Sequence, residues 1–393
     1  MNIVIFSHPV FLNSQSMPRY ANWLAKGMKA RGHSVKVLTA QPLFYKLRAP
    51  GSIRKWLGYI DQFLVFPASA KKQIRNADRE TIFVYSDHAL GPWVPLTQGR
   101  PHVIHCHDFL AQQSALKLID YNPTSWTGTK YQGMIRRGFQ SGKNFISISK
   151  KTQSDLHALL TEKPGVSQIV YNGLLKDFKP GNVEQNRTEL SGATGLNLSA
   201  GYILHVGGNQ WYKNRKGVIE IYDAWRASSG TSLPLLMVGA KPTTALLESY
   251  QQATHKNDIH FLTGKDDDFI MKAYQGATAF LFPSIAEGFG WPIAEAMASG
   301  SPVITTAEAP MNEVGGNAAF YIPKYPEHPG ELQAWLAEAA TMLSRVVNLA
   351  SEERQEVIDN GLRHVKRFDS DNALDQIEKI YQNILRDENP SRN

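Results

Sequence analysis

The sequence predicts an α/β protein built from two doubly wound, Rossmann-like domains that face a cleft. The first observation is length, because 393 residues amount to about two ordinary domains. The second is that short apolar runs of strand length alternate with segments of helical periodicity, which favours parallel pairing of the strands. The third is that this alternation occurs twice, before and after a polar segment at residues 176–200 that we interpret as the connection.

The first domain is expected over residues 1–178. Residues 3–6 form an apolar run typical of a buried strand, and residues 20–31 place apolar side chains at helical spacing until Gly32 ends the helix. Later strands of this domain are expected at residues 35–38, 81–85, 102–106, 144–148 and 168–170.

The second domain is expected over residues 179–372. Its first strand is expected at residues 202–206, followed by a helix over about 217–226. Residues 331–386 read as largely helical, and the C-terminal helix, about 373–393, is expected to pack back on the first domain. Further strands are expected at residues 235–238, 259–262, 279–282 and 302–305.

The composition excludes several classes of protein. No stretch approaches the ~18 consecutive apolar residues of a membrane-spanning helix, and residues 1–6 lack the features of a signal peptide. Cys106 is the only cysteine, so no intrachain disulfide can form and a reducing cytoplasm is the expected compartment. The net charge of +7 divides unevenly, at +15 for residues 1–180 and −8 for residues 181–393. This division indicates an anionic partner for the first half.

Residues 279–306 carry the densest pattern of chemistry. A strand ends at Phe282, a loop with Gly288 and Gly290 follows, and a helix begins near Pro292. Such a turn leaves free backbone N–H groups that bind an anion, most often a phosphate. Glu287 on the loop and Glu295 in the first turn of the helix are suited to accept hydrogen bonds from sugar hydroxyls. The competing interpretation is a plain strand–helix turn in which Glu295 complements the helix dipole.

A cationic loop at residues 205–218 follows the first strand of the second domain. Lys213, Arg215 and Lys216 lie beside the turn at Gly207 and Gly208. Fixed cations at a helix start can stabilise a departing nucleoside diphosphate without a metal ion. The competing interpretation is a solvated basic turn.

The segment from Glu287 onward resembles the E-x7-E signature of retaining glycosyltransferases of the GT-B fold, family 4, also called glycosyl transferases group 1. The matching residues are Glu287, Gly288, Phe289, Gly290, Pro292, Glu295, the run 296–300, and Pro302 with Val303. The resemblance implies that Glu295 holds the ribose of a nucleotide-sugar and that Glu287 lies at the donor sugar. It also implies that the backbone at Phe289 and Gly290 approaches the sugar and diphosphate. Trp291 stands where a smaller aliphatic residue is usual.

The resemblance extends to the cationic loop, where family members carry an Arg/Lys pair. Lys216 fits one register of that pattern and Lys213 the other, so both are predicted phosphate ligands with Arg215 as a substitute, and Gly208 belongs to the same donor site. Gly264 lies where relatives place a nucleotide-base loop. The acidic run 266–268 is therefore interpreted as a helix start and not as a metal site.

The acceptor side is expected in the first domain. The resemblance implies a histidine directly after the strand at 102–106, near the donor sugar or the acceptor hydroxyl, and His107 fits this position. Asp108 is expected either to orient His107 or to cap the next element. From the residues alone, His105 and His107 share one face of the strand and are equally interpreted as packed or capping polar groups. Weaker acceptor candidates lie after the first strand, namely Ser14, Gln15, Ser16 and Arg19.

Residues 53–66 combine an apolar stripe with basic neighbours. Ile53, Trp56, Leu57, Ile60, Phe63 and Leu64 fall at helical spacing, with Arg54 and Lys55 opposite. A basic, aromatic, amphipathic stretch suits a membrane interface, and an apolar stripe equally suits a core-facing helix. The two interpretations remain open at this point.

The predicted function is therefore a retaining, metal-independent glycosyltransferase that moves a sugar from a nucleotide-sugar to an acceptor hydroxyl. Its predicted catalytic residues are Glu287, His107 and Lys216. The resemblance implies cell-surface polysaccharide or glycolipid assembly and a sugar or lipid-linked acceptor. No cofactor or metal is expected. The expected location is the cytoplasm, and the membrane interpretation of residues 53–66 would add peripheral contact with the inner face of the plasma membrane. The alternatives are a nucleotide-sugar epimerase of related fold and a basic nucleic-acid-binding protein, for which the sequence contains no recognisable motif.

Overall fold

The computed structural model describes residues 1–12, 16–174 and 177–387, and it confirms the α/β fold class. Contacts between residues divide the chain into two compact units. The first unit comprises Met1–Gly173 and the C-terminal segment from Ser370, and the second comprises Leu174–Asp369. The boundaries thus fall a few residues before the expected ones at 178 and 372. Ser14 and Gln15, two of the acceptor candidates, lie outside the described residues.

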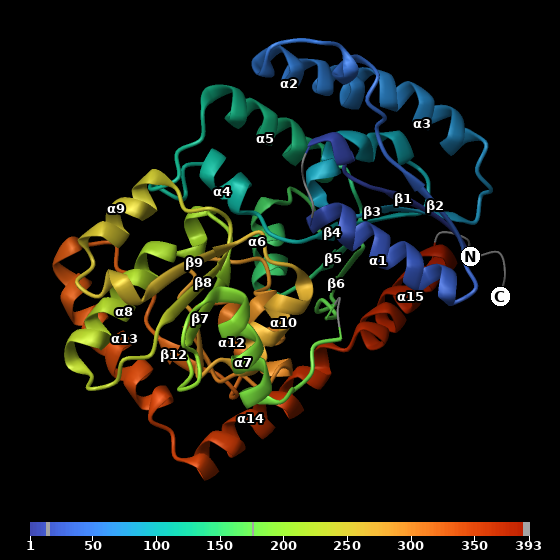
Figure 1. Ribbon diagram of the computed structural model, residues 1–393. Helices are drawn as coiled ribbons and strands as arrows, with labels where there is room; N and C mark the ends of the chain where they lie inside the picture. The colour runs from blue at the N-terminus through green and yellow to red at the C-terminus, as the bar shows by residue number, and fades with distance from the viewer. Residues whose placement is uncertain (13–15, 175–176, 388–393) are drawn as a thin grey trace. The chain divides into compact units, whose positions relative to one another are not determined.

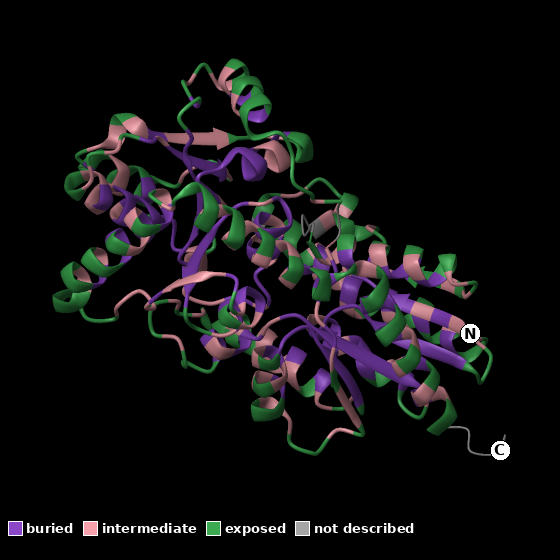
Figure 2. Ribbon diagram, turned by 90° about the horizontal axis from the view of Figure 1, so that it is seen from below, coloured by how far each residue is buried: buried purple, intermediate pink, exposed green. Residues whose placement is uncertain are grey.

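The first unit is built on a parallel sheet of order β2-β1-β3-β4-β5-β6. Its strands carry almost no charged side chains, and β3, β4 and β5 in the interior of the sheet are buried along their whole length, as expected for a sheet covered on both faces (Figure 2). The register pairs Asn2 with Ser34 on one side of β1 and with Thr81 on the other. The strands are β1 Asn2–Phe6, β2 Ser34–Leu38, β3 Thr81–Tyr85, β4 His102–Cys106, β5 Asn144–Ser147 and β6 Val166–Ile169.

Helices on the two faces of this sheet complete two apolar cores. One core includes side chains of α3, η4 and α5, and the other joins α1 to α15, which lie side by side in Figure 1. The helical segments are η1 Val10–Leu12, α1 Ser16–Ala30, η2 Phe44–Lys46, α2 Gly51–Ile60, the π-helix η3 Asp61–Val65, α3 Phe66–Arg75, η4 His88–Thr97, α4 Leu110–Ala115, α5 Trp126–Phe139, α6 Lys150–Leu159 and α15 Ser370–Asp387.

The second unit repeats the plan with a parallel sheet of order β12-β11-β10-β7-β8-β9. The strands are β7 Ile203–Gly207, β8 Leu235–Gly239, β9 Ile259–Thr263, β10 Ala279–Phe282, β11 Val303–Thr306 and β12 Phe320–Ile322, of which the three-residue β12 was not predicted. The helical segments are α7 Val183–Thr194, η5 Trp211–Lys213, α8 Arg215–Ser228, α9 Thr244–Gln252, η6 Lys256–Asp258, α10 Asp267–Gly276, α11 Trp291–Ala298, α12 Met311–Gly315, η7 Pro329–Glu331, α13 Leu332–Val347, α14 Ser351–Val365 and η8 Lys366–Phe368.

Three local expectations are corrected. The segment 176–200 is not only a connection, because α7 forms inside it between an Asn182 N-cap and the left-handed Gly195 (φ 73°). Glu295 lies in the second turn of its helix, because α11 already begins at Trp291. The stretch 53–66 is not one regular helix, since α2 passes into the π-helix η3 at Asp61.

Candidate functional site

In the second unit, two loops meet at the carboxyl edge of the sheet. The loop after β7 and the loop after β10 are adjacent because these strands are neighbours. The backbone N–H of Ile285 donates to the carbonyl of Tyr212 at 2.7 Å, and Asn214 donates from Nδ2 to the carbonyl of Pro283 at 3.0 Å. Asn214 has a left-handed backbone (φ 50°) and caps α8 by accepting from the N–H of Gly217. One residue therefore both starts the helix and fixes the two loops together.

Lys213 and Glu287 form a buried ion pair between these loops. The ammonium Nζ of Lys213 lies 2.7 Å from Oε1 of Glu287, and the side chains are 15% and 7% exposed. The same Oε1 accepts a hydrogen bond from the hydroxyl of Ser284 at 2.9 Å. The ammonium also lies 5.0 Å from the ring centroid of Phe282. The structure thus brings together two of the predicted site residues.

Arg215 is buried at the same edge with part of its guanidinium unsatisfied. Its Nη1 donates to the carbonyl of Ala240 at 2.9 Å and to the side-chain oxygen of Asn209. Its Nε and Nη2 are buried and have no hydrogen-bond partner in the described chain. Burial lowers the pKa of Arg215. Because its Nε and Nη2 lack acceptors in the part of the chain that the structure describes, Arg215 is a buried cation with unpaired N–H groups. Such a group is suited to bind an anion.

His205 on β7 has a second unsatisfied nitrogen. Its Nδ1 lies 3.0 Å from the carbonyl oxygen of Leu281, while Nε2 is buried and unpartnered within the described residues. Burial lowers the pKa of His205 to about 3; the bond to the Leu281 carbonyl opposes this shift, and the charges of Arg215 and Lys213 add to it. His205 is therefore neutral beside these two cations. The sequence analysis predicted no functional role for His205.

Lys216 lies away from this pair. Its side chain is 57% exposed, and its ammonium lies 3.4 Å from Glu220, one helical turn along α8. Burial lowers its pKa, but Glu220 and then Tyr325 oppose this, and the net shift is upward. Of the two registers that the sequence left for the family's lysine, the structure brings Lys213 to Glu287 and directs Lys216 to its own helix.

The residues from Gly288 to Gly290 lead into α11, and Glu295 lies within it. Gly290 has φ 102°, a left-handed conformation that glycine adopts readily, and it immediately precedes the helix. Phe289 is buried against Phe368, with 5.4 Å between ring centroids. Oε2 of Glu295 accepts a hydrogen bond from the buried Tyr274 hydroxyl at 3.1 Å. Burial and then the Glu295 charge raise the pKa of Tyr274, so this hydroxyl stays a donor that fixes the carboxylate.

Three further donor-site candidates lie in the same unit, two of them on loops and Trp291 at the start of α11. Gly208 directly follows β7. Gly264 follows β9 with φ 66°, and Asp266 then caps α10 by accepting from the N–H of Phe269 at 2.9 Å, which confirms the predicted helix start. The indole N–H of Trp291 is buried and has no acceptor among the described residues. Within those residues, no three His, Cys, Asp or Glu side chains gather in a way that could hold a metal ion.

In the first unit, His107 lies at the carboxyl edge directly after β4. Its Nε2 lies 2.8 Å from the carbonyl oxygen of Ser86, and the ring is buried edge-on against Tyr20. Burial lowers its pKa. Oδ1 of Asp108 accepts from the N–H of Leu110 at 3.1 Å, a local turn that leads into α4, whose N-cap residue is Phe109. His105, on the same face of β4, lies 2.7 Å from the hydroxyls of Tyr20 and Tyr381.

The remaining acceptor candidates are exposed. Ser16 and Arg19 lie in the first turn of α1, and both are exposed. The edge of this unit also carries His8, Asp87 and His88, which the sequence analysis did not single out. A strand-end position was their one available signal.

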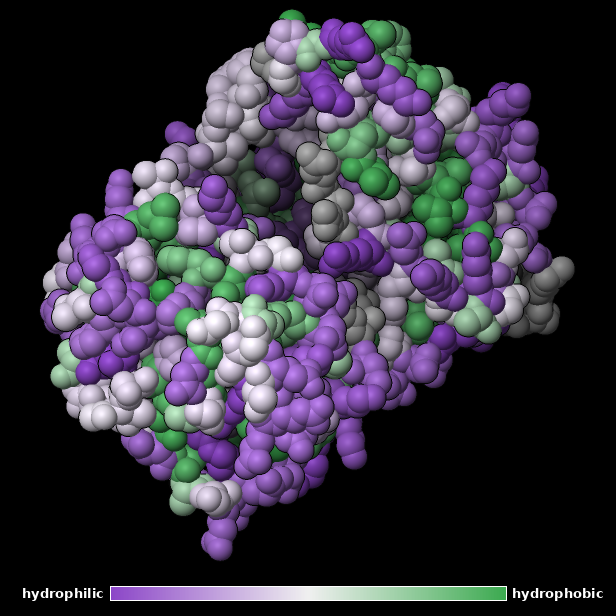
Figure 3. Space-filling model, viewed as in Figure 1, coloured by the Kyte–Doolittle hydropathy of each residue, from purple (hydrophilic) through white to green (hydrophobic). Residues whose placement is uncertain are grey.

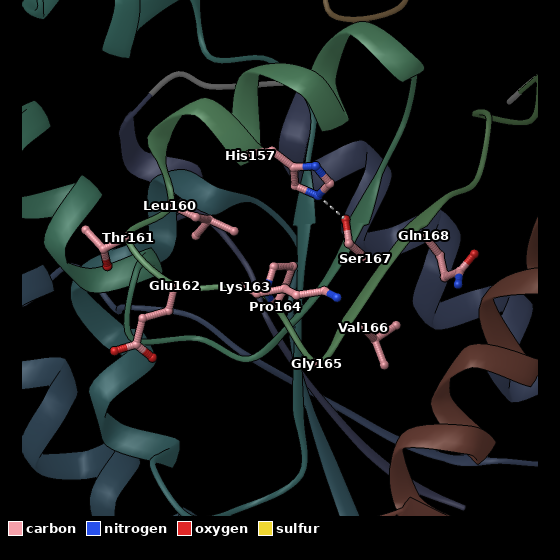
Figure 4. A pocket seen from close by; sticks show the side chains of 10 residues that line it. All are labelled: His157, Leu160, Thr161, Glu162, Lys163, Pro164, Gly165, Val166, Ser167 and Gln168. Atoms are coloured by element: carbon pink, nitrogen blue, oxygen red, sulfur yellow. Dashed lines mark hydrogen bonds between the residues drawn. The ribbon is translucent and has the colours of Figure 1, made fainter.

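A pocket of about 660 Å³ in the first unit lies at the opposite edge of the sheet (Figure 4). It is lined by His157 and residues 160–168, which lead from α6 into the beginning of β6. Figure 4 shows His157 hydrogen-bonded to Ser167, with 2.9 Å between Nε2 and Oγ. Because ligands of open α/β sheets bind at the carboxyl ends of the strands, we do not include this pocket in the candidate site.

Two models of known protein families match this chain. A model described as "Glycosyl transferases group 1" matches residues 186–361, and one described as "Glycosyltransferase Family 4" matches residues 17–175. The chain belongs to this glycosyltransferase family. The predicted family is therefore confirmed.

Curated relatives of this glycosyltransferase include bacterial enzymes with different names. O-antigen chain mannosyltransferase B of Escherichia coli is 27% identical over 46% of either chain. D-rhamnosyltransferase WbpZ of Pseudomonas aeruginosa is 27% identical over 70% of this chain and 68% of that protein. N-acetyl-alpha-D-glucosaminyl L-malate synthase of Bacillus anthracis is 23% identical over 93% of both. The chain thus spans about half the length of the first relative and a larger share of the length of the other two.

Solved structures show the same GT-B fold. WaaG, a glycosyltransferase involved in lipopolysaccharide biosynthesis, superposes with a TM-score of 0.70 at 17% identity, covering 96% of this chain and 99% of WaaG. Anabaena Alr3699/HepE, solved in complex with UDP and glucose, gives a TM-score of 0.71 at 16% identity, covering 98% and 100%. At these identities the likeness establishes the fold alone.

Proposed function

We propose that this glycosyltransferase moves a hexose from a nucleotide-sugar to an acceptor hydroxyl, with retention of configuration and without a metal ion. The observation that carries the proposal is the buried Arg215, whose Nε and Nη2 have no partner in the described chain. A buried guanidinium with unpaired N–H groups binds a phosphate strongly, because the anion replaces the water that burial removed. The nucleoside diphosphate of the donor supplies such an anion.

Lys213 and Glu287 would act on the reacting end of the donor. Their ion pair places a cation and a carboxylate within 2.7 Å of each other at the loop that precedes α11. Lys213 would stabilise the charge that develops on the diphosphate as the sugar leaves, and Glu287 would hold a sugar hydroxyl. Glu295, fixed by Tyr274 at 3.1 Å, would accept from the ribose hydroxyls.

The relatives named above favour assembly of a cell-surface polysaccharide or glycolipid, with a sugar or lipid-linked acceptor. Two of them are named for mannosyl and rhamnosyl transfer, and a solved neighbour holds UDP and glucose. In this chain, His107 would lie on the acceptor side of the reaction. No cofactor is needed for this chemistry, because the leaving group carries the activation.

A thermal-shift and hydrolysis screen over UDP-, GDP- and ADP-sugars tests the proposal. We expect one nucleotide class to raise the melting temperature and to be hydrolysed slowly. Arg215→Met should lose this shift, whereas Arg226→Met should keep it, because Arg226 on the same helix is paired with Asp258. Absence of any shift would contradict donor binding. Conversion of the donor to an isomer without an acceptor would favour an epimerase.

We also propose that the first unit binds the surface of an anionic membrane. No described helix is long and apolar enough to cross a bilayer, so the docking would be peripheral. Five apolar side chains between the residue before η2 and the middle of α2 are 42–60% exposed: Leu43, Phe44, Leu47, Ile53 and Trp56. Figure 3 shows hydrophobic and hydrophilic residues intermingled on the face over α2 and α3.

Charge complementarity favours a lipid surface for this patch. Residues 1–60 contain no Asp or Glu, and the first acidic residue, Asp61, is buried. Its carboxylate accepts backbone hydrogen bonds from Leu43, Phe44 and Tyr45 at 2.9–3.1 Å. It thereby fixes the η2 loop beside α2. Exposed apolar side chains among lysines and arginines are typical of interfacial segments.

Co-sedimentation with phosphatidylglycerol-containing vesicles tests the membrane proposal. Trp56→Glu should reduce the bound fraction, because a carboxylate replaces an inserted indole and adds repulsion. Val183→Glu is the control, since Val183 is also exposed, at 42%, but lies on α7 of the second unit. Equal binding of Trp56→Glu and wild-type protein would contradict the proposal.

A further inference from the structure

Two histidines share one buried carboxylate at the carboxyl edge of the first sheet. His8 follows β1, and Asp87 with His88 follows β3, and these strands are direct neighbours. Nε2 of His8 lies 2.8 Å from Oδ2 of Asp87, and Nδ1 of His88 lies 2.9 Å from Oδ1. Oδ1 also accepts from the N–H of Ala89 at 3.2 Å, so Asp87 caps η4. The cluster therefore joins two strand ends.

Asp87 is ionised despite its burial. Burial alone would raise its pKa, but the charge of His88 and the hydrogen bond with His8 hold it well below its usual range. For His88, burial acts to lower the pKa and Asp87 raises it, and the net shift is upward. An ionised carboxylate only accepts hydrogen bonds, so Nε2 of His8 must be the donor to it.

This assignment leaves Nδ1 of His8 as the free nitrogen. In a neutral imidazole, one nitrogen carries the proton and the other offers a lone pair. With the proton on Nε2, the lone pair is on Nδ1, and the imidazole ring of His8 makes no other hydrogen bond with the described residues. The His8 side chain is 16% exposed, whereas His107 at the same edge is buried and directs its Nε2 to a backbone carbonyl. His8 can thus receive a ligand's hydroxyl proton in a hydrogen bond.

We propose that His8 binds the acceptor hydroxyl through Nδ1, and that Asp87 is its positioning residue. This inference rests on the proposed glycosyl transfer and names the ligand chemistry of the first unit: a neutral hydroxyl, since a lone pair attracts an O–H donor and repels an anion. Asp87 fixes the ring orientation and the tautomer, in the same way that a carboxylate orients the base of a hydrolytic triad. His88 keeps that carboxylate charged.

The tautomer can be measured in the whole protein without an acceptor. In ¹⁵N-histidine-labelled protein, with the His8 signals assigned from their loss in His8→Gln, we expect the neutral His8 ring to carry its proton on Nε2. Asp87→Ala should convert it to a mixture of tautomers. His255 is the matched control, because it forms a similar pair with Asp223 at 2.8 Å in the second unit and should not respond. An Nδ1–H form of His8 in the wild-type protein would overturn the proposal.

Donor hydrolysis tests the role, with water as the hydroxyl probe. Using the donor found by the thermal-shift screen, His8→Gln and Asp87→Ala should lower kcat by about tenfold or more while donor affinity changes less than twofold. His255→Gln should change neither. An unchanged kcat in both variants, or an equal loss of donor affinity, would overturn the proposal. If no nucleotide-sugar binds, the proposed function fails, and the His8 tautomer still decides the geometry claimed here.

Discussion

Breaking the Lys213–Glu287 ion pair should destabilise the second unit even before any donor binds. In Lys213→Met, the Glu287 carboxylate keeps its bond from Ser284 at 2.9 Å but loses its only ion-pair partner in the described chain, at 2.7 Å. Both side chains are largely buried, at 15% and 7% exposure. Removing one partner of a buried pair costs roughly 3–5 kcal/mol, and the surviving hydrogen bond places this case near 3 kcal/mol.

The reverse change and the double change sharpen the expectation. Glu287→Gln leaves the Lys213 ammonium 5.0 Å from the ring of Phe282 and 5.5 Å from the ring of Tyr212. Lys213 is also more exposed to solvent than Glu287, so Glu287→Gln should destabilise the second unit less than Lys213→Met does. In Lys213→Met/Glu287→Gln, neither an unpaired ammonium nor an unpaired carboxylate remains. The double variant should therefore be less destabilised than the sum of the two single variants, by roughly 1–3 kcal/mol.

Hydrogen exchange of the peptides that contain β7 and β10 is the suitable assay, measured without nucleotide. Exchange reports the opening of the second unit by itself, whereas a global melting curve would mix the two units. A cost below 1 kcal/mol for Lys213→Met, or strictly additive effects in the double variant, would refute the reasoning. It would mean that water solvates Glu287 as well as Lys213 does.

Three further outcomes are expected. Glu295→Ala should weaken donor binding at least tenfold in isothermal titration, with Glu313→Ala as a control, and unchanged affinity would remove Glu295 from the donor site. Transfer activity should be unaffected by excess EDTA, and its loss would overturn metal independence. Burial, and then the charge of His107, lowers the pKa of His105 to about 3 in the folded chain, below its usual 6.5. The unfolded state then binds the extra proton on acidification, so stability should fall as the pH drops from 6.5 toward 3, by up to about 1.4 kcal/mol per pH unit. His105→Gln should flatten that dependence in acid unfolding, and an equal slope would contradict the assignment.

Much of the fold was predictable, because strand and helix periodicity is a local property of the sequence. All the predicted strands form, and of the strands described only β12 was not predicted. The helix α7 was missed because its apolar face is narrow and because its end signals, Asn182 and Gly195, lie within a polar run. The π-helix at Asp61 was also missed. Its carboxylate is held by a loop 16–18 residues earlier in the chain, and no periodicity encodes such a contact.

The candidate site was predictable where one motif carried it. Glu287 and Glu295 were identified from a contiguous run, but the choice between Lys213 and Lys216 required three-dimensional structure. The two residues are three apart, and only the left-handed backbone of Asn214 between them directs Lys213 to Glu287 and starts the helix that carries Lys216. His8 and Asp87 are 79 residues apart, so only the neighbouring positions of β1 and β3 bring them together.

The return of α15 to the first unit determines when that unit can finish folding during synthesis. Five apolar side chains of α15 belong to the core shared with α1 and the sheet, so the first unit stays incomplete until α15 has been translated: Ala373, Leu374, Ile377, Tyr381 and Ile384. At roughly 5–20 residues per second, the intervening second unit takes about 10–40 s to synthesise. The second unit is continuous and can close first. Throughout that interval, the side of the first unit that α15 covers, including His105 beside Tyr381, is exposed to chaperones and proteases.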